Sequence, residues 1–302
     1  MSIKHKTIEP RALAAGTMFA VLLCAIAPES RGAENTGHNA IPDFSSNGLA
    51  WGLNCLHADG SPCANNTAFV KVPGDTGPGP VLQHPDYPYE HNENKRMADT
   101  NNPILQTWVK EKMDVEVARV IAGGFPFIPT SRCWPGGVPG IHLYTGNVHF
   151  IQSEEMVWIL QERDAPRRIL MNVAHSDNPE HSLYGESIGH YEGDSLVVDT
   201  IALVDNGPID RLNTPHTKQL HVVERFELLE GSQRMRVSFT ITDPGTFTQP
   251  WNAMVEYEHG TERGQPDVPA KWDEYVCNEN SVEYFIPEGE LVPVPSAARR
   301  DF

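Results

Sequence analysis

The chain has 302 residues, of which 40 are acidic and 23 are lysine or arginine, so its formal net charge is −17 at pH 7. This negative charge disfavours contact with phosphate backbones and anionic membranes, so neither nucleic acid nor a membrane is an expected partner of the mature protein. Hydrophobic residues make up 39% and charged residues 21%, which excludes a coiled coil and a disordered acidic tail. The 24 glycines and 25 prolines favour strands and turns over long helices.

Residues 1–33 have the pattern of a secretory signal peptide. Lys4, Lys6 and Arg11 precede an apolar run that begins at Ala12 and ends in small residues. With roughly 15 residues, this run is too short to cross a bilayer comfortably. We expect cleavage at or before Ala33 and a periplasmic or secreted bacterial protein, with no membrane contact after cleavage.

Four cysteines follow the expected cleavage point, and an even number in an exported chain is typical of disulfide bonds. Of the three ways to pair them, we favour a local Cys55–Cys63 bridge and a Cys133–Cys277 bridge across the main domain. In the chain-entropy model the longer bridge would contribute about 4–5 kcal/mol. Thiolate ligands to a metal are the alternative, although no C-x-x-C pair occurs.

The chain changes character twice after the signal peptide. Residues 34–103 are rich in Asn, Gly and Pro, which predicts an extended arm on the surface. Residues 104–120 predict the one clear helix, because their apolar side chains recur at helical spacing and Gly123 and Gly124 supply a stop. These side chains are Ile104, Leu105, Trp108, Val109 and Met113.

Short segments rich in Val, Ile and aromatic residues begin at about Asn147 and are separated by turns. They are residues 148–162, 167–172, 194–204, 219–229, 233–242, 251–258 and 272–278. The pattern predicts a mainly β fold: an antiparallel meander that closes into a lipocalin-like barrel or packs as a two-layer sandwich, so that its edges are hidden. We place this domain, with its leading helix, at residues 104–285, followed by a tail at 286–302.

Gly185–Gly189 matches the G-x-S-x-G pattern of a nucleophile elbow. The elbow requires a helix directly after the serine, whereas the residues that follow here predict a turn and a β-branched strand. Ser187 is therefore interpreted as a serine at the entry of a strand.

Glu224 is the leading catalytic candidate. On a strand over 219–229 it shares one face with Val222 and Phe226, so it interrupts an apolar stripe. Desolvation there would favour the neutral carboxyl, and a raised pKa suits a general acid or base. A buried ion pair with an arginine or a histidine is the alternative interpretation.

Other side chains could complete a site around this carboxyl. His216, on a loop, or His190 would be its proton-transfer partner, and Arg225 would stabilise developing negative charge or pair with Asp194 or Asp199. The expected substrate-binding residues are Tyr191, His221, Trp251 and Phe226.

A metal site could use His216, His221 and Glu224. On a strand, however, His221 and Glu224 fall on opposite faces, which argues against joint ligation of zinc or copper. No phosphate-binding glycine loop occurs, and an exported chain lacks access to nucleotides. We therefore expect neither a metal nor a cofactor.

Four motifs in the second half of the chain occur in order. They are G-x-S-x-G-x-(W/Y)-E-G-D-(T/S)-L-V-V-D-T at Gly185–Thr200, P-H-(S/T)-x-x-L-H-V-x-E-R-(F/Y) at Pro215–Phe226, T-I-x-D-P-x-x-(Y/F)-T-x-P-W at Thr240–Trp251 and E-Y-x-C-x-E-N at Glu274–Asn280. With Cys133–Pro139, they resemble a large family of exported bacterial β-rich proteins. The resemblance covers roughly residues 120–280 and supports the domain limits and the β architecture, but it implies no activity, cofactor or substrate.

The sequence departs from this family in two places. Met171–Val173 replaces a D-G-R-type turn, and Tyr191 stands where tryptophan is usual. Both departures lie near the candidate site, so an activity of the family could be altered in this chain.

The functional expectation is an exported, cofactor-independent enzyme that applies acid–base chemistry to a small, largely apolar organic molecule, as an isomerase, lyase or cyclase does. A β-barrel that binds a small molecule without turnover is the first alternative, and a metal-dependent hydrolase is the second. The sequence does not determine the oligomeric state, and a homo-oligomer is compatible with it.

Overall fold

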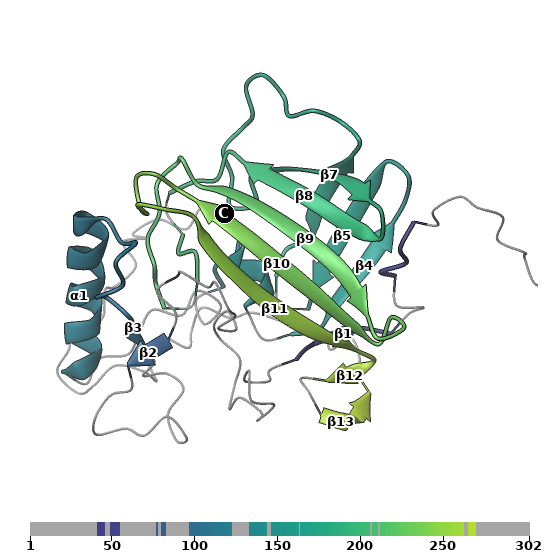
Figure 1. The fold of residues 1–302 in the computed structure, drawn as a ribbon, viewed down its shortest axis with the longest axis horizontal. Helices are drawn as coiled ribbons and strands as arrows, with labels where there is room; N and C mark the ends of the chain where they lie inside the picture. Colours follow the sequence, from purple (N-terminus) through teal and green to yellow (C-terminus); the bar gives the residue numbers. More distant parts are fainter. Residues whose placement is uncertain are drawn as a thin grey trace, which may run out of the picture. The chain divides into compact units, whose positions relative to one another are not determined.

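Strands β4 to β11, with β1 between β11 and β4, form a closed barrel in the order β1-β11-β10-β9-β8-β7-β6-β5-β4 in the computed structural model (Figure 1). The barrel strands are β1 (Trp51–Asn54), β4 (Val148–Gln152), β5 (Met156–Gln161), β6 (Arg167–Met171), β7 (Glu186–Glu192), β8 (Ser195–Ile201), β9 (His221–Leu229), β10 (Arg234–Thr242) and β11 (Trp251–His259). The mainly β prediction is confirmed, with a barrel rather than a sandwich.

The structure describes residues 41–45, 49–54, 77, 80–82, 97–122, 133–143, 146–162, 164–205, 207–210, 212–262 and 265–269. All of them belong to one unit, Asn39–Phe302. Two small two-stranded sheets accompany the barrel: β2 (Pro80–Leu82) pairs with β3 (Met97–Ala98), and β12 (Thr261–Glu262) pairs with β13 (Gln265–Pro269). The expected strand 272–278, the expected tail 286–302 and the expected signal peptide lie outside the described residues.

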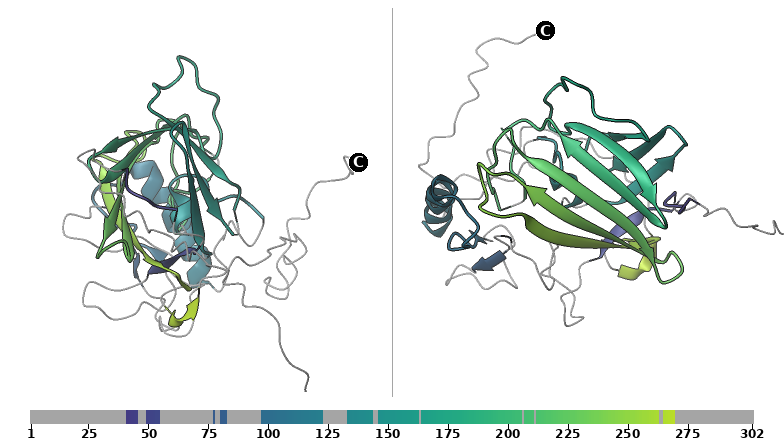
Figure 2. Two further views of the ribbon diagram at one scale, coloured as in Figure 1. Left: turned by 90° about the vertical axis from the view of Figure 1, so that its right-hand side faces the viewer. Right: turned by 45° about the horizontal axis from the view of Figure 1, so that its top comes forward.

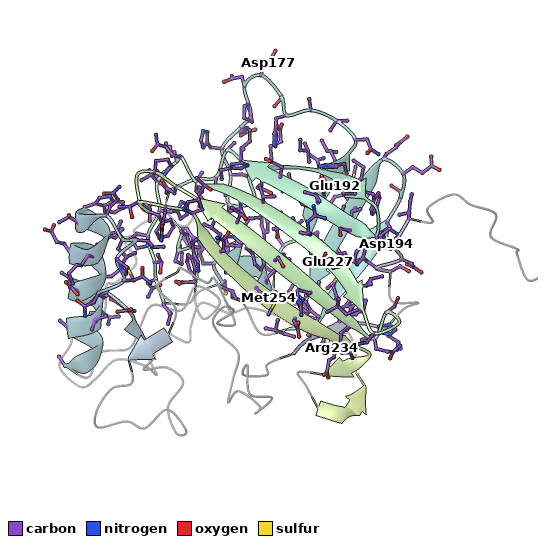
Figure 3. All side chains as sticks on the ribbon, in the orientation of Figure 1. Asp177, Glu192, Asp194, Glu227, Arg234 and Met254 are labelled. Atoms are coloured by element: carbon purple, nitrogen blue, oxygen red, sulfur yellow. The ribbon has the colours of Figure 1, made fainter. Side chains whose placement is uncertain are left out.

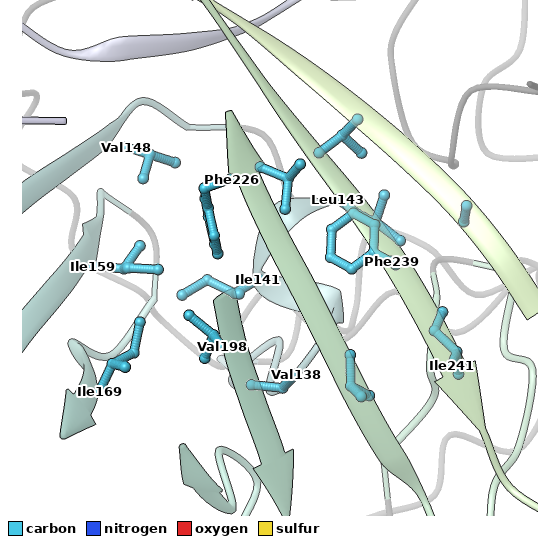
Figure 4. Close-up of a cluster of buried hydrophobic side chains, with 14 of the residues drawn as sticks. Val138, Ile141, Leu143, Val148, Ile159, Ile169, Val198, Phe226, Phe239 and Ile241 are labelled. Carbon is cyan, nitrogen blue, oxygen red and sulfur yellow. The ribbon is translucent and has the colours of Figure 1, made fainter. Parts of the chain in front are cut away.

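The barrel strands follow the alternation of apolar side chains in the sequence. Along β9 every second residue from Val222 points inward, and β8 and β10 place Leu196, Val198 and Phe239 beside them. Figure 4 shows Phe226, Phe239 and Val198 together in this interior. Burial of one face and exposure of the other thus fixes the register of these strands.

One pair of strands differs from the expected meander. β6 and β7 are parallel and share only the pairs Leu170↔Ile188 and Met171↔Gly189, whereas β7 and β8 are antiparallel over their whole length. Strand β7 was not among the predicted segments. Gly189 permits the close approach, because a Cβ there would lie 2.9 Å from the Ile169 side chain. Parallel strands cannot be joined by a hairpin, so residues 172–185 form a longer crossover.

The expected surface arm also contributes to the barrel. Strand β1 pairs with β11 and, through Trp51↔Val148, with β4, so it closes the barrel. Trp51 is buried, its indole N–H donates to the Phe44 carbonyl at 2.9 Å, and Phe44 itself packs against Phe150 and Phe226. The hydrophobic effect therefore draws these aromatic residues out of the arm and into the core.

A short segment of the chain, Val138–Leu143, packs into the barrel interior. It contains the 3-10 helix η4 (Gly140–His142), and every residue in it is buried. Ile141 and Leu143 lie beside Phe226 and Phe239 in Figure 4. The barrel therefore holds part of its own chain, which we call the inner segment.

The predicted helix is confirmed as α1 (Thr107–Ile121), which begins three residues later than expected. Ile104 and Leu105 precede it, and Leu105 forms a bridge with Phe247. Val109 and Met113 are buried with Leu212. In the described part of the chain, no helix combines the length and the apolar character that crossing a membrane requires.

Candidate functional site

A cluster of polar side chains lies at the centre of the apolar barrel interior. Four adjacent strands contribute one inward residue each: Arg167 from β6, Ser187 from β7, Thr200 from β8 and Glu224 from β9. Their exposed fractions are 0%, 4%, 0% and 0%. The registers Ser187↔Thr200 and Val198↔Glu224 place them on the same face of the sheet.

The guanidinium of Arg167 connects the cluster. Its Nη1 donates to Glu224 Oε1 at 2.8 Å, and its Nη2 donates to Glu224 Oε2, to Thr200 Oγ1 at 3.0 Å and to Ser187 Oγ at 3.2 Å. The contact with Glu224 is bidentate, which is the strongest geometry for this pair. One side chain thus links β6 to β9 across the short parallel pairing of β6 and β7.

Glu224 is ionised in this environment. Burial by itself would raise its pKa, but the charge and hydrogen bonds of Arg167, with help from His142, lower the pKa to about 2. The expectation of a raised pKa is therefore wrong, and a pKa near neutrality no longer supports Glu224 as a general acid or base. The alternative interpretation, a buried ion pair with an arginine or a histidine, describes the structure, and Glu224 contacts both kinds of residue.

His142 of the inner segment joins this ion pair to a buried tyrosine. Its Nε2 lies 2.8 Å from Glu224 Oε1, and its Nδ1 lies 2.8 Å from the hydroxyl oxygen of Tyr257. Burial lowers the pKa of His142, and Arg167 lowers it further, although Glu224 opposes the change. A neutral imidazole with its proton on Nε2 satisfies both contacts: Nε2–H donates to the carboxylate, and Nδ1 accepts from the tyrosine.

Tyr257 keeps its proton. Burial and the nearby Glu224 carboxylate both raise its pKa well above the ordinary value. The result is a chain of hydrogen bonds from the Tyr257 hydroxyl through His142 to an ionised carboxylate held by Arg167. Phe226 and Phe239 flank the imidazole at ring-centroid distances of 5.7 and 5.4 Å, so the relay lies in an apolar, weakly screened environment.

The predicted substrate-binding residues are spread over the barrel. Phe226 is buried against the His142 ring, as a lining residue should be. Trp251 is buried in an edge-to-face contact with Phe247. Tyr191 is half-buried, and its hydroxyl accepts a hydrogen bond from Gln152 at 2.9 Å. Of these three, the described contacts bring only Phe226 to the Glu224 cluster.

The predicted proton-transfer and anion-binding partners do not meet Glu224. His190 and Arg225 are on the outer wall, where both contact Glu192, which is labelled in Figure 3. Arg225 thus pairs with Glu192 rather than with Asp194 or Asp199. His216 is buried in its loop, its Nδ1 lies 3.0 Å from the Thr217 carbonyl, and burial lowers its pKa. Alternation along β9 already places Arg225 on the face opposite Glu224. Spacing could not place His190, because its strand β7 was not predicted, or His216, because it lies on a loop.

His221 is also on the outer wall, where its Nε2 contacts Asp199 at 3.0 Å. Glu224 points inward from the same strand, as the alternation of the strand predicted, so the grouping with His216 is not assembled. Among the residues that the structure describes, no group of three or more His, Cys, Asp or Glu is arranged to hold a metal ion. Cys133 is described, but Cys55, Cys63 and Cys277 lie outside the described residues, so the disulfide pairing stays a prediction.

Ser187 lies within β7 with its hydroxyl 2.9 Å from Thr200 Oγ1 and within reach of Arg167. No helix follows it, because β7 continues to Glu192. Ser187 is thus a serine near the start of a strand, as interpreted, although this strand, β7, was not among the predicted segments.

Sequence reasoning missed Arg167, His142 and Tyr257. Arg167 carried a usable signal, because it interrupts the inward stripe of Ile169 and Met171 with a charge opposite to that of Glu224. Two opposite charges that interrupt apolar stripes on nearby strands indicate a buried pair. His142 offered no such signal, since its segment enters the barrel without belonging to a strand.

Comparisons with family models, with curated proteins and with solved structures gave no match for this chain.

Proposed function

We propose that this protein is an exported, cofactor-independent enzyme that moves a proton on a small, largely apolar organic molecule, as an isomerase, lyase or cyclase does. The observation that carries the proposal is the relay from the Tyr257 hydroxyl through neutral His142 to ionised Glu224. Its logic is that of the catalytic triads, in which a carboxylate orients a histidine and the histidine takes the proton of a hydroxyl.

The proposed proton transfer keeps atoms and charges balanced. A proton leaves the substrate for Tyr257 Oη while the proton already on that oxygen passes to His142 Nδ1. The imidazolium that forms lies 2.8 Å from the Glu224 carboxylate, which stabilises its charge. Return of the proton to a different substrate atom completes an isomerisation. Departure of a leaving group that takes up this proton through Tyr257, which leaves His142 neutral again, completes an elimination.

Arg167 has a positioning role in this proposal. Because it holds Glu224 ionised, the carboxylate accepts the Nε2–H of His142 and fixes the tautomer that leaves Nδ1 as the base. The aromatic rings around His142 favour an apolar substrate. His142 belongs to the inner segment, so the segment must keep its contacts with Glu224 and Tyr257 during turnover. The proposal therefore requires neighbouring apolar side chains such as Ile141 and Leu143 to make room for a substrate beside Tyr257.

The second candidate is a barrel that binds a small molecule without converting it. It is favoured by the closed barrel and its apolar interior, which are features of small-molecule carriers. In that case the polar cluster would serve only to hold the inner segment in place.

The Tyr257→Phe variant tests the enzyme, because it removes one oxygen and keeps the ring. The mature protein is incubated with a total small-molecule extract, which is then examined by mass spectrometry. We expect compounds converted by the parent protein to be converted about 100-fold more slowly by Y257F, while the free energy of unfolding changes by only about 1–2 kcal/mol.

Tyr191→Phe is the matched control, since it also removes a tyrosine hydroxyl from a hydrogen bond but lies outside the relay. It should keep full turnover. Retention of compounds without a change of mass would favour the carrier, and neither conversion nor retention would contradict both candidates.

A further inference from the structure

A second polar cluster lies on the outer wall, directly behind the inner one. The same strands carry it: Glu186 precedes Ser187 on β7, Asp199 precedes Thr200 on β8, and His221 opens β9. His175, from the crossover between β6 and β7, lies among them. Its Nδ1 is 2.9 Å from Glu186 Oε1, and its Nε2 is 2.9 Å from Asp199 Oδ1.

The hydrogen bonds of His175 depend on its charge. Both of its ring nitrogens face carboxylate oxygens, and an ionised carboxylate only accepts hydrogen bonds. A neutral imidazole has one N–H and can satisfy one of the two contacts, whereas the imidazolium has two and satisfies both. The arrangement is therefore complete only when His175 is protonated.

Further hydrogen-bond donors contact the two carboxylates. Glu186 accepts the backbone N–H of Ser176 at 2.9 Å and its hydroxyl at 2.6 Å. The hydroxyl contact and His175 lower the pKa of Glu186. Asp199 also accepts from His221 Nε2. Glu186, Asp199 and, beyond it, His221 are the titratable groups that β7, β8 and β9 direct to this place, while Asp177 points outward from the tip of the crossover (Figure 3).

His175 and Ser176 fasten the middle of the crossover. At one end Asn172 N–H donates to the Gly189 carbonyl, and at the other end Ser182 is bonded to Ala202 and Val204. Between these ends the residues are largely exposed, and the described contacts of 173–180 with the strands are those of His175 and Ser176. The loop stands away from the strands in two views (Figures 1 and 2).

We propose that His175, Glu186 and Asp199 form a pH-sensitive clasp that holds residues 173–180 to the outer wall when His175 is protonated and releases them as the pH rises. The direction of the pH dependence follows from the number of N–H donors: the imidazolium donates to both carboxylates, and one of the two hydrogen bonds is lost when the imidazole gives up its proton. At still lower pH the clasp weakens again, because the carboxylates become protonated.

Hydrogen exchange of the mature protein, read by mass spectrometry on peptides that cover 173–180, tests the clasp. After correction for the pH dependence of intrinsic exchange, we expect opening to be about threefold more frequent at pH 8 than at pH 5.5, as befits a partly exposed charged pair. His175→Asn should open equally often at both pH values, at the rate of the parent protein at pH 8.

His190→Asn is the matched control, because His190 lies on the same wall but contacts a single carboxylate, Glu192. This variant should keep the pH dependence of the parent protein. Equal opening of the parent protein at both pH values, or an unchanged pH dependence in H175N, would overturn the proposal. Nitrogen-15 NMR of the imidazole gives an independent readout, since both ring nitrogens of His175 should carry protons at pH 5.5.

Discussion

The inner and outer polar clusters share strands β7, β8 and β9 but lie on opposite faces of them, and solvent reaches the outer cluster. Inside, Glu224 is fully buried, and a permanently charged arginine keeps it ionised while its histidine partner is neutral. Outside, the Asp199 side chain is 34% exposed and its partners are two histidines. Burial therefore makes the inner pair costly to break, whereas solvent and salt screen the outer one.

The largest expected effect comes from Arg167→Met. The change leaves the Glu224 carboxylate buried without its cation, which should lower the free energy of unfolding by about 3–5 kcal/mol. Chemical denaturation measures the loss. Arg168→Met is the matched control, because Arg168 is exposed on the other face of β6 and should cost less than about 1 kcal/mol. If both variants lost the same free energy of unfolding, the buried ion pair would contribute no more to stability than an exposed arginine does.

The second largest expected effect is a loss of folding stability at acidic pH, when Glu224 becomes protonated. The pKa of Glu224 is about 2 in the folded protein against an ordinary value of 4.5, so the carboxylate contributes stability above pH 4.5 that is lost as the pH falls toward 2. The contribution is on the order of 3 kcal/mol. Denaturation curves between pH 5 and 2 should show a shallower slope for Glu224→Gln than for the parent protein. Parallel slopes would contradict the assignment of this titration to Glu224.

The outer cluster should respond much less to the same kind of change. Asp199→Asn removes the charged acceptor of His175 and His221, and we expect it to cost about 0.5–1 kcal/mol in chemical denaturation at pH 6. Glu224→Gln at the same pH is the comparison, since it removes a carboxylate of the inner cluster. If D199N lowered the free energy of unfolding by about 3 kcal/mol or more, the outer cluster would be as important for stability as the inner one, against this prediction.

The smallest expected effect is the change that added salt makes to the stability differences between variants and the parent protein. Raising the NaCl concentration from 0.05 to 1 M should remove most of the stability difference between D199N and the parent protein, because the outer charges are screened. The difference between R167M and the parent protein should stay within about 0.5 kcal/mol, because the inner pair excludes solvent. The two denaturation series can be run side by side.

Much of the barrel could be predicted from sequence because its cause is local. Alternation along 219–229, 233–242 and 251–258 placed β9, β10 and β11 to within two residues. The parallel pairing of β6 and β7 could not be predicted in this way, since pairing between strands depends on contacts distant in sequence. Strand β1 was hidden in a stretch whose proline and glycine content resembles a loop.

The candidate site was predicted in part. Glu224 was identified because it interrupts an apolar stripe, but the sign of its pKa shift depends on Arg167, which lies 57 positions earlier. The histidines selected near Glu224 in sequence lie elsewhere, and the histidine that contacts it belongs to the inner segment, 82 positions away. A pattern within one strand reveals which face a residue occupies, and the partner across the barrel comes only from the fold.

The inner segment fills part of the barrel interior, so it competes with any bound molecule for that space. Any molecule that enters must displace side chains such as Ile141 and Leu143, whose covalent attachment keeps their local concentration high. Apparent affinity for a guest is then reduced by the fraction of time that the segment is inside. A guest that drives the Val138–Leu143 stretch outward also separates His142 from Glu224 and Tyr257, as only the carrier permits. Protease cleavage at this stretch should therefore increase with occupancy of the interior of a carrier, whereas a substrate of the proposed enzyme should leave it protected.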